Sequence, residues 1–306
     1  MQAKLATIIQ GISRFLLGKE HEIRLAMACL LARGHLLIED IPGVGKTTMA
    51  EAMARVLGLQ LRRIQFTSDL LPADILGVSV FDRREQDFAF HPGPIFAQVI
   101  LADEINRAAP KTQSALLEAM EEGQVTMDGQ TRVLPQPFFV IATQNPLHQI
   151  GTFPLPESQL DRFLMRIHLG YPDPEAEREL LRLADPRKAL RACEALIHPE
   201  EQQDLQAGVL RVHVADALLD YIQALLHASR DANVYQAGLS PRAGRALLRG
   251  SQSWAFLEGR SMVLPEDVQA VLPSITAHRL RPGRDAPDAV LEDPVDFLLR
   301  IPLPHP

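Results

Sequence analysis

Cysteine is nearly absent from this sequence. Cys29 and Cys193 are the only two cysteines among 306 residues, and no metal-ligand spacing surrounds either of them. Two distant cysteines exclude the disulfide framework of a small secreted domain. Free thiols are typical of a reducing compartment, so we expect a cytoplasmic protein.

Positive charge and long apolar runs are also scarce. The chain carries 31 lysines and arginines against 38 acidic residues, a net charge of −7. This balance disfavours tight non-specific binding to nucleic acid, although a local basic patch would survive it. No apolar run reaches the roughly 18 residues of a membrane span, and residues 1–10 lack the apolar block of a signal peptide. No membrane insertion is expected.

Strand and helix patterns alternate through the first half of the chain. Short apolar runs typical of buried strands occur at 35–39, 61–66, 98–102 and 138–142. Apolar residues recur at helical spacing at 23–32, 47–57 and 112–122. This alternation predicts an α/β fold with a parallel sheet through about residue 170.

The pattern changes after Tyr171-Pro172-Asp173-Pro174. Beyond it we find only helical patterns, at 175–183, 216–229, 241–257 and 265–277. We therefore predict two domains, an α/β core at 1–171 and a small α-helical domain at 172–306. Within the core, two hairpins are predicted, one over 78–90 and one around Asp128-Gly129, a dipeptide that suits a tight turn with positive φ.

A glycine-rich turn between a strand and a helix carries the clearest chemistry. In Gly43-Val44-Gly45-Lys46-Thr47, the glycines let backbone N–H groups close around phosphate oxygens at a helix start. Lys46 would reach the β- and γ-phosphates, and the Thr47 hydroxyl would ligate Mg²⁺. The strict P-loop pattern has glycine where this sequence has Asp40. The phosphate-cradling glycines remain, so we predict a site for ATP and Mg²⁺.

Two acidic residues follow the buried strand pattern at 98–102. Asp103 and Glu104 would therefore lie at the carboxyl end of a parallel strand, where such a fold places its ligands. We expect Asp103 to hold Mg²⁺ through water and Glu104 to orient and activate the attacking water. Asn145 ends the next strand, where its amide could hold that water or the γ-phosphate, although Asn-Pro is also an ordinary turn signal.

Arg162 allows two interpretations. Offered to the ATP of a neighbouring subunit, it would neutralise charge in the transition state. Paired with the adjacent Asp161, it would be an ordinary surface salt bridge. The sequence leaves both open, and it favours a solvated helix face for Glu118, Glu121 and Glu122.

Five segments in one order resemble the AAA+ ATPases, and specifically the MoxR family in the helix-2-insert clade. They are Ile38 to Thr47, Leu101 to Ala108, Ala142 to Pro146, Leu160 to Phe163 and Ser240 to Ala243. Asp40 is acceptable in that family. The resemblance implies a P-loop AAA+ parallel-sheet core followed by a small α-helical lid domain.

The resemblance also implies roles for individual residues. Asn145 resembles sensor 1, Arg162 the arginine finger and Arg242 sensor 2 on the lid. Gly18 falls in a stretch that resembles the segment wrapping the adenine, although glutamine is more usual than the lysine that follows it. The residues implied to bind the nucleotide are Gly18, Pro42, Gly43, Val44, Gly45, Lys46, Thr47, Thr48 and Arg242.

The function implied by the resemblance is that of an ATPase which assembles into a ring, expected to be a hexamer. It would couple Mg²⁺-dependent ATP hydrolysis to remodelling, chaperoning or maturation of a protein complex, with a von Willebrand factor A domain protein as partner. Both predicted hairpins would project toward the ring's pore. Two alternatives stay open, a DNA-associated motor or loader and a nucleotide-gated scaffold with little turnover.

Overall fold

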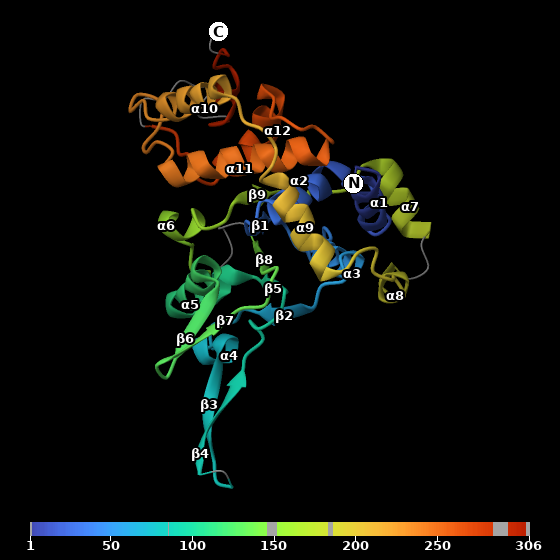
Figure 1. The fold of residues 1–306 in the computed structure, drawn as a ribbon, viewed down its shortest axis with the longest axis vertical. Helices are drawn as coiled ribbons and strands as arrows, with labels where there is room; N and C mark the ends of the chain where they lie inside the picture. Colours follow the sequence, from blue (N-terminus) through green and yellow to red (C-terminus); the bar gives the residue numbers. More distant parts are fainter. Residues whose placement is uncertain (1, 85, 146–151, 183–185, 284–292, 304–306) are drawn as a thin grey trace.

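A parallel sheet of five strands forms the centre of the N-terminal part (Figure 1). The computed structural model describes residues 2–84, 86–145, 152–182, 186–283 and 293–303. In spatial order the strands are β2 (Leu61–Gln65), β5 (Val99–Asp103), β8 (Phe139–Gln144), β1 (Leu36–Glu39) and β9 (Met165–Ile167). β5 and β8 are buried at every position, as expected for strands covered on both faces. The predicted α/β fold is confirmed, whereas β9 was not predicted.

Helices cover both faces of this sheet. Alternate strand residues such as Leu36 and Ile38 join a core with α1 (Gln2–Ser13), α2 (Glu20–Leu31) and α3 (Lys46–Val56). Their neighbours, such as Leu37, face a second core beneath α4 (Pro72–Leu76), the 3₁₀ turn η1 (Ile105–Arg107) and α5 (Pro110–Glu122). The carboxyl ends of β1, β5 and β8 are thereby held at one edge, where the predicted site residues follow.

After β9, the described residues form helices and two isolated bridges but no strand. The helices after β9 are α7 (Pro174–Arg182), α8 (Pro186–Arg191), α9 (Pro199–Val209), α10 (Asp216–Ala228), α11 (Pro241–Leu257), α12 (Pro265–Thr276) and α14 (Asp296–Leu299). One short helix, α6 (Glu157–Leu160), directly precedes β9. The sheet part and the helical part share a core, and the Arg24 guanidinium on α2 lies 5.5 Å from the Trp254 ring of α11. The domain division between residues 171 and 172 stays a prediction. None of the helices in the described ranges is both long and apolar enough to cross a membrane.

Two antiparallel hairpins extend from the sheet part, as predicted. One pairs β3 (Gly77–Asp82) with β4 (Asp87–Pro92) and forms the far end of the molecule in Figure 1. The other pairs β6 (Gln124–Met127) with β7 (Gln130–Val133). Its turn residues Asp128 and Gly129 have φ of +52° and +74°, the positive values that a two-residue hairpin turn needs.

The two hairpins touch each other. Ser79 donates a hydrogen bond of 2.5 Å to Asp128, and the Arg132 guanidinium lies 3.8 Å from the Phe90 ring centroid. Phe81 and Phe88 pack edge to face at 5.4 Å, yet they are 50% and 67% exposed. Phe90 is therefore partly covered near the base of the hairpin, whereas Phe81 and Phe88 are exposed near its tip.

His35, which precedes β1, ties the sheet to α5 from a buried position. Its Nδ1 accepts the N–H of Val140 at 3.1 Å, so Nε2 carries the proton and donates to the Met120 carbonyl at 3.1 Å. Burial lowers the pKa of His35 to about 4 from an ordinary value of 6.5. The folded state therefore contains the neutral ring at pH values where the unfolded chain is protonated.

We expect the free energy of unfolding to fall as the pH drops from about 6.5 toward about 4. Between pH 6.5 and about 4, His35 is protonated in the unfolded chain but neutral in the folded one. The free energy of unfolding therefore falls by up to about 1.4 kcal/mol per pH unit because of this residue. His35→Asn keeps an acceptor for Val140 and should flatten the slope by that amount in urea unfolding at pH 7, 6 and 5. Some slope should persist because burial also lowers the pKa of His278. Equal slopes in parent and variant would contradict the assignment.

Candidate active site

The glycine-rich turn connects β1 to α3 with two residues in the left-handed region. Gly43 and Gly45 have φ of +91° and +101°, which side chains rarely tolerate. A Cβ built on Gly43 would meet nothing within 4 Å, and one on Gly45 would meet only Leu16 at 4.0 Å. The loop therefore presents open backbone beside the start of α3, the geometry that suits a phosphate group. Pro42 and Gly43 are exposed, whereas Val44 packs against the core.

Asp40 replaces the first glycine of the strict pattern for a structural reason. Its carboxylate is buried and accepts the backbone N–H groups of Ile41 at 2.8 Å, Leu169 at 2.7 Å and Gly170 at 2.6 Å. Three charge-assisted hydrogen bonds compensate the burial of this anion. Asp40 thereby anchors the phosphate-binding turn to the segment that follows β9, which glycine could not do.

The Lys46 ammonium is buried inside the turn. It donates to the carbonyl oxygens of Asp40 and Ile41, the latter at 3.2 Å, and to Asn145 Oδ1 at 3.2 Å. Burial lowers the pKa of Lys46, and the nearby carboxylates of Asp40, Asp103 and Glu104 oppose this shift. The three oxygens that accept hydrogen bonds from Lys46 are two backbone carbonyls and one side-chain amide, and all are neutral. The positive charge of Lys46 is therefore available to an anionic ligand.

Asp103 and Glu104 lie at the end of β5 and share one partner on β8. Thr143 Oγ1 donates to Asp103 Oδ1 at 2.6 Å and accepts the N–H of Glu104 at 2.9 Å. Glu104 has φ +56° and ψ +48°, a left-handed conformation that costs a non-glycine residue roughly 1–2 kcal/mol. Such strain is typical of functional positions. At Glu104 this conformation ends the alternation of side chains along β5.

Asn145 links Lys46 to Glu104. Its Nδ2 donates to Glu104 Oε1 at 3.0 Å, while its Oδ1 accepts from Lys46. The other oxygen, Glu104 Oε2, accepts from Gln65 at 3.1 Å and pairs with Arg107 at 3.1 Å. The structure thus brings together four of the predicted residues, Lys46, Asp103, Glu104 and Asn145.

The oxygen donors suit Mg²⁺. Thr47 offers a hydroxyl at the start of α3 and Asp103 offers a carboxylate, the hard ligands that this ion prefers. The described residues contain no group of three or more His, Cys, Asp or Glu side chains that could hold a metal. Mg²⁺ in nucleotide sites is usually held by one or two protein groups together with water and phosphate oxygens.

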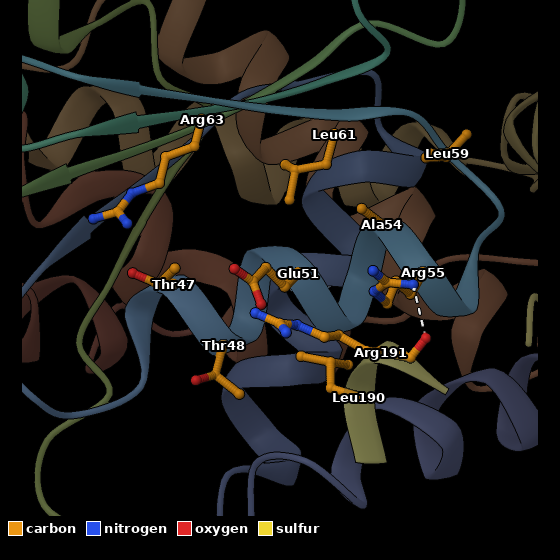
Figure 2. A pocket seen from close by; sticks show the side chains of 10 residues that line it. All are labelled: Thr47, Thr48, Glu51, Ala54, Arg55, Leu59, Leu61, Arg63, Leu190 and Arg191. Carbon is orange, nitrogen blue, oxygen red and sulfur yellow. Dashed lines mark hydrogen bonds between the residues drawn. The ribbon is translucent and has the colours of Figure 1, made fainter. Parts of the chain in front are cut away.

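A pocket of about 620 Å³ opens beside this region. Figure 2 shows Thr47 and Thr48 of α3 facing it, with Arg63 of β2 on the opposite wall. The predicted adenine segment begins beside the glycine turn, since Leu16 lies 4.0 Å from a Cβ built on Gly45. The Lys19 ammonium donates to the Tyr171 carbonyl at 2.8 Å. Gly18, with φ +69°, packs so closely on the start of α7 that a Cβ would lie 2.9 Å from Asp173.

Arg162 and Arg242 lie together, but apart from the phosphate-binding turn. Arg162 Nε is 3.1 Å from Glu121 Oε2, and Arg242 Nη2 is 3.2 Å from Glu121 Oε1. Asp161 instead pairs with Arg279 at 2.6 Å. The alternative of an Arg162–Asp161 salt bridge is therefore wrong, and so is a purely solvated role for Glu121.

The arginine pair lies near the start of β1, whereas the phosphate-binding turn lies at its end. Arg162 and Arg242 line a pocket of about 320 Å³ together with Gly34 and His35, which precede β1, whereas the phosphate-binding turn follows it. The two features are separated by the strand, four residues or about 13 Å long. Arg162 and Arg242 thus lie at the opposite end of β1 from Lys46.

Several residues of the site were not predicted. Thr143, Gln65 and Arg63 contact the two acidic residues, and Glu121 contacts both arginines. Thr143 had a weak signal, as the one hydroxyl residue after a run of buried apolar positions. The contacts of Gln65 and Arg63 depend on which strands are neighbours, and those of Glu121 depend on which elements meet the end of α5.

Comparison with known proteins shows which family this chain is similar to. The family described as ATPase family associated with various cellular activities (AAA) matches residues 35–165, and the AAA lid domain matches residues 227–297. Chaperone MoxR1 of Mycobacterium tuberculosis is 40% identical over 293 residues, covering 90% of this chain and 75% of that protein. Protein MoxR of Paracoccus denitrificans is 34% identical, with 88% and 86% covered. Uncharacterized protein YeaC of Bacillus subtilis is 46% identical, with 90% and 86% covered.

A solved structure agrees with these relatives. The crystal structure of a proposed ATPase from Cytophaga hutchinsonii superposes with a TM-score of 0.88 at 34% sequence identity. The match covers 99% of this chain and 96% of that one. The similarity therefore extends through the sheet, the hairpins and the helical part.

Proposed function

The chain belongs to the MoxR family of AAA+ ATPases, and from this premise we propose that it hydrolyses ATP with Mg²⁺. The observation that carries the proposal is the continuous contact from Lys46 through Asn145 to Glu104, beside Asp103. It connects a cation suited to phosphate with a carboxylate suited to activating water.

Each residue then has a role that its contacts support. The backbone of residues 42–45 and Lys46 bind the phosphates, with Thr48 and Gly18 near the rest of the nucleotide. Mg²⁺ held by Thr47 and, through water, by Asp103 would neutralise phosphate charge during transfer. Glu104 orients the attacking water and takes its proton, and Asn145 fixes Glu104 relative to Lys46.

We assign Arg162 and Arg242 to the ATP of a neighbouring subunit. Their position at the other end of β1 supports action in trans, because their pocket lies beside Gly34 and His35, whereas the Lys46 turn of the same chain follows that strand. A ring, expected to be hexameric, would bring them to the next active site. Hydrolysis in such a ring would drive remodelling, chaperoning or maturation of a protein complex. A von Willebrand factor A domain protein is the expected partner.

Removing the charge of Lys46 tests nucleotide binding directly. Lys46→Met should weaken the affinity for a fluorescent ATP analogue by roughly 10- to 100-fold, the size expected for a lost hydrogen bond to a charged group. Lys111→Met, at an exposed position of α5, is the matched control and should bind like the parent. Parent-like affinity in the Lys46 variant would show that ATP binds elsewhere.

A further inference from the structure

Asp103 is paired with a cation from its own chain. Arg63, on the neighbouring strand β2, places Nη2 2.5 Å and Nε 3.2 Å from Asp103 Oδ2. The other oxygen, Oδ1, accepts from Thr143. Both carboxylate oxygens are therefore engaged, and the guanidinium takes the oxygen that is not held by Thr143.

The exposure of the two side chains shows which partner can move. The Asp103 side chain is 11% exposed and is held by β8, whereas the Arg63 side chain is 52% exposed. Arg63 also donates to Gln65 Oε1 at 3.1 Å, and Gln65 in turn donates to Glu104. A single half-exposed guanidinium thus contacts one acidic residue directly and the other through one amide.

Space for an alternative position of Arg63 is present. The pocket of about 620 Å³ is lined by Arg63 and by Thr47, whose hydroxyl is proposed to ligate Mg²⁺ (Figure 2). Glu51, one turn after Thr47 on α3, adds a carboxylate to the same pocket. The guanidinium can therefore leave Asp103 without entering the protein core.

We propose that Arg63 is a resident counter-cation that occupies Asp103 in the absence of Mg²⁺ and leaves it when the ion is bound. The inference rests on the proposed function, because it takes Thr47 as a metal ligand and Asp103 as the carboxylate that holds the metal through water. Arg63 compensates the Asp103 charge while the site is empty. Mg²⁺ must displace Arg63 from Asp103 when it binds, and this displacement lowers the contribution of the ion to nucleotide affinity.

The test compares the affinity for a fluorescent ATP analogue at saturating Mg²⁺ and in EDTA. With a non-hydrolysable analogue, the ratio of the two affinities measures what Mg²⁺ contributes to binding without any turnover. In Arg63→Met this ratio should rise about five- to tenfold, the size of a half-exposed, doubly hydrogen-bonded ion pair. The rise should shrink at high salt, which screens that pair. Arg63→Lys should give a smaller rise, because it keeps the charge but loses the two-atom contact.

Arg62→Met is the matched control on the same strand. Arg62 is exposed and makes no ion pair with the described residues, so its removal should leave the ratio unchanged. A ratio in Arg63→Met that is unchanged, or lower than in the parent, would overturn the proposal. A lower ratio would make Arg63 a permanent positioning residue for Asp103. Failure of the parent to bind ATP under both conditions would instead overturn the proposed function, and this inference with it.

Discussion

The Arg162→Ala variant should hydrolyse ATP about 10³- to 10⁵-fold more slowly than the parent, the range observed for arginines that complete a nucleotide site in trans. The arginine would neutralise charge that develops on the transferred phosphate, so its loss should act on kcat. ATP affinity should change far less, because Lys46 and the glycine turn belong to the other subunit of the composite site. Steady-state turnover together with ATP binding separates the two effects.

A matched arginine is available for comparison. Arg211 is exposed and lines a different pocket, beside Gln2 and Leu5. Arg211→Ala should therefore keep parental turnover. The parent itself should show specific activity that rises with protein concentration as subunits meet. A dilute monomer with full turnover, or an Arg162→Ala variant with parental kcat, would contradict the role in trans.

The Glu104→Gln variant should bind ATP like the parent and hydrolyse it about 10²- to 10⁴-fold more slowly. Glutamine keeps the shape of the side chain and can still contact Asn145 and Gln65, but it cannot take a proton from water. Single-turnover hydrolysis of pre-bound ATP measures this step alone. Glu118→Gln, exposed on α5, is the control and should turn over normally. Parental hydrolysis by the Glu104 variant would remove Glu104 as the base.

The sequence predicted those elements whose conformation is determined by their own residues and immediate neighbours. The turn at 42–45 is bounded by an apolar strand pattern and a helix pattern, and Asp128-Gly129 matches its turn type. α9 was missed because its register is set by distant contacts. Its buried residues include Gln202 and Gln206 besides the apolar Leu205 and Val209, and Gln206 donates to the Leu30 carbonyl at 2.8 Å. Two buried apolar positions one turn apart are too short a pattern to predict a helix.

The site shows the same division. Lys46, Asp103 and Glu104 were predictable because each follows a strand or a glycine turn in sequence. The contacts of Arg63, Gln65 and Thr143 were not, because they require the strand order β2-β5-β8. The pairing of Arg162 and Arg242 through Glu121 likewise depends on which ends of the strands and helices meet in space.

Mixing two inactive variants tests the composite site most directly. Lys46→Met lacks the phosphate-binding cation and keeps Arg162, whereas Arg162→Ala keeps Lys46 and lacks the arginine. Mixed rings would contain interfaces at which an intact Lys46 faces an intact Arg162. We therefore predict that ATPase activity, nearly absent from each variant alone, reappears on mixing and is greatest near equal proportions. Absence of recovery in rings shown to contain both variants would contradict a site shared between subunits.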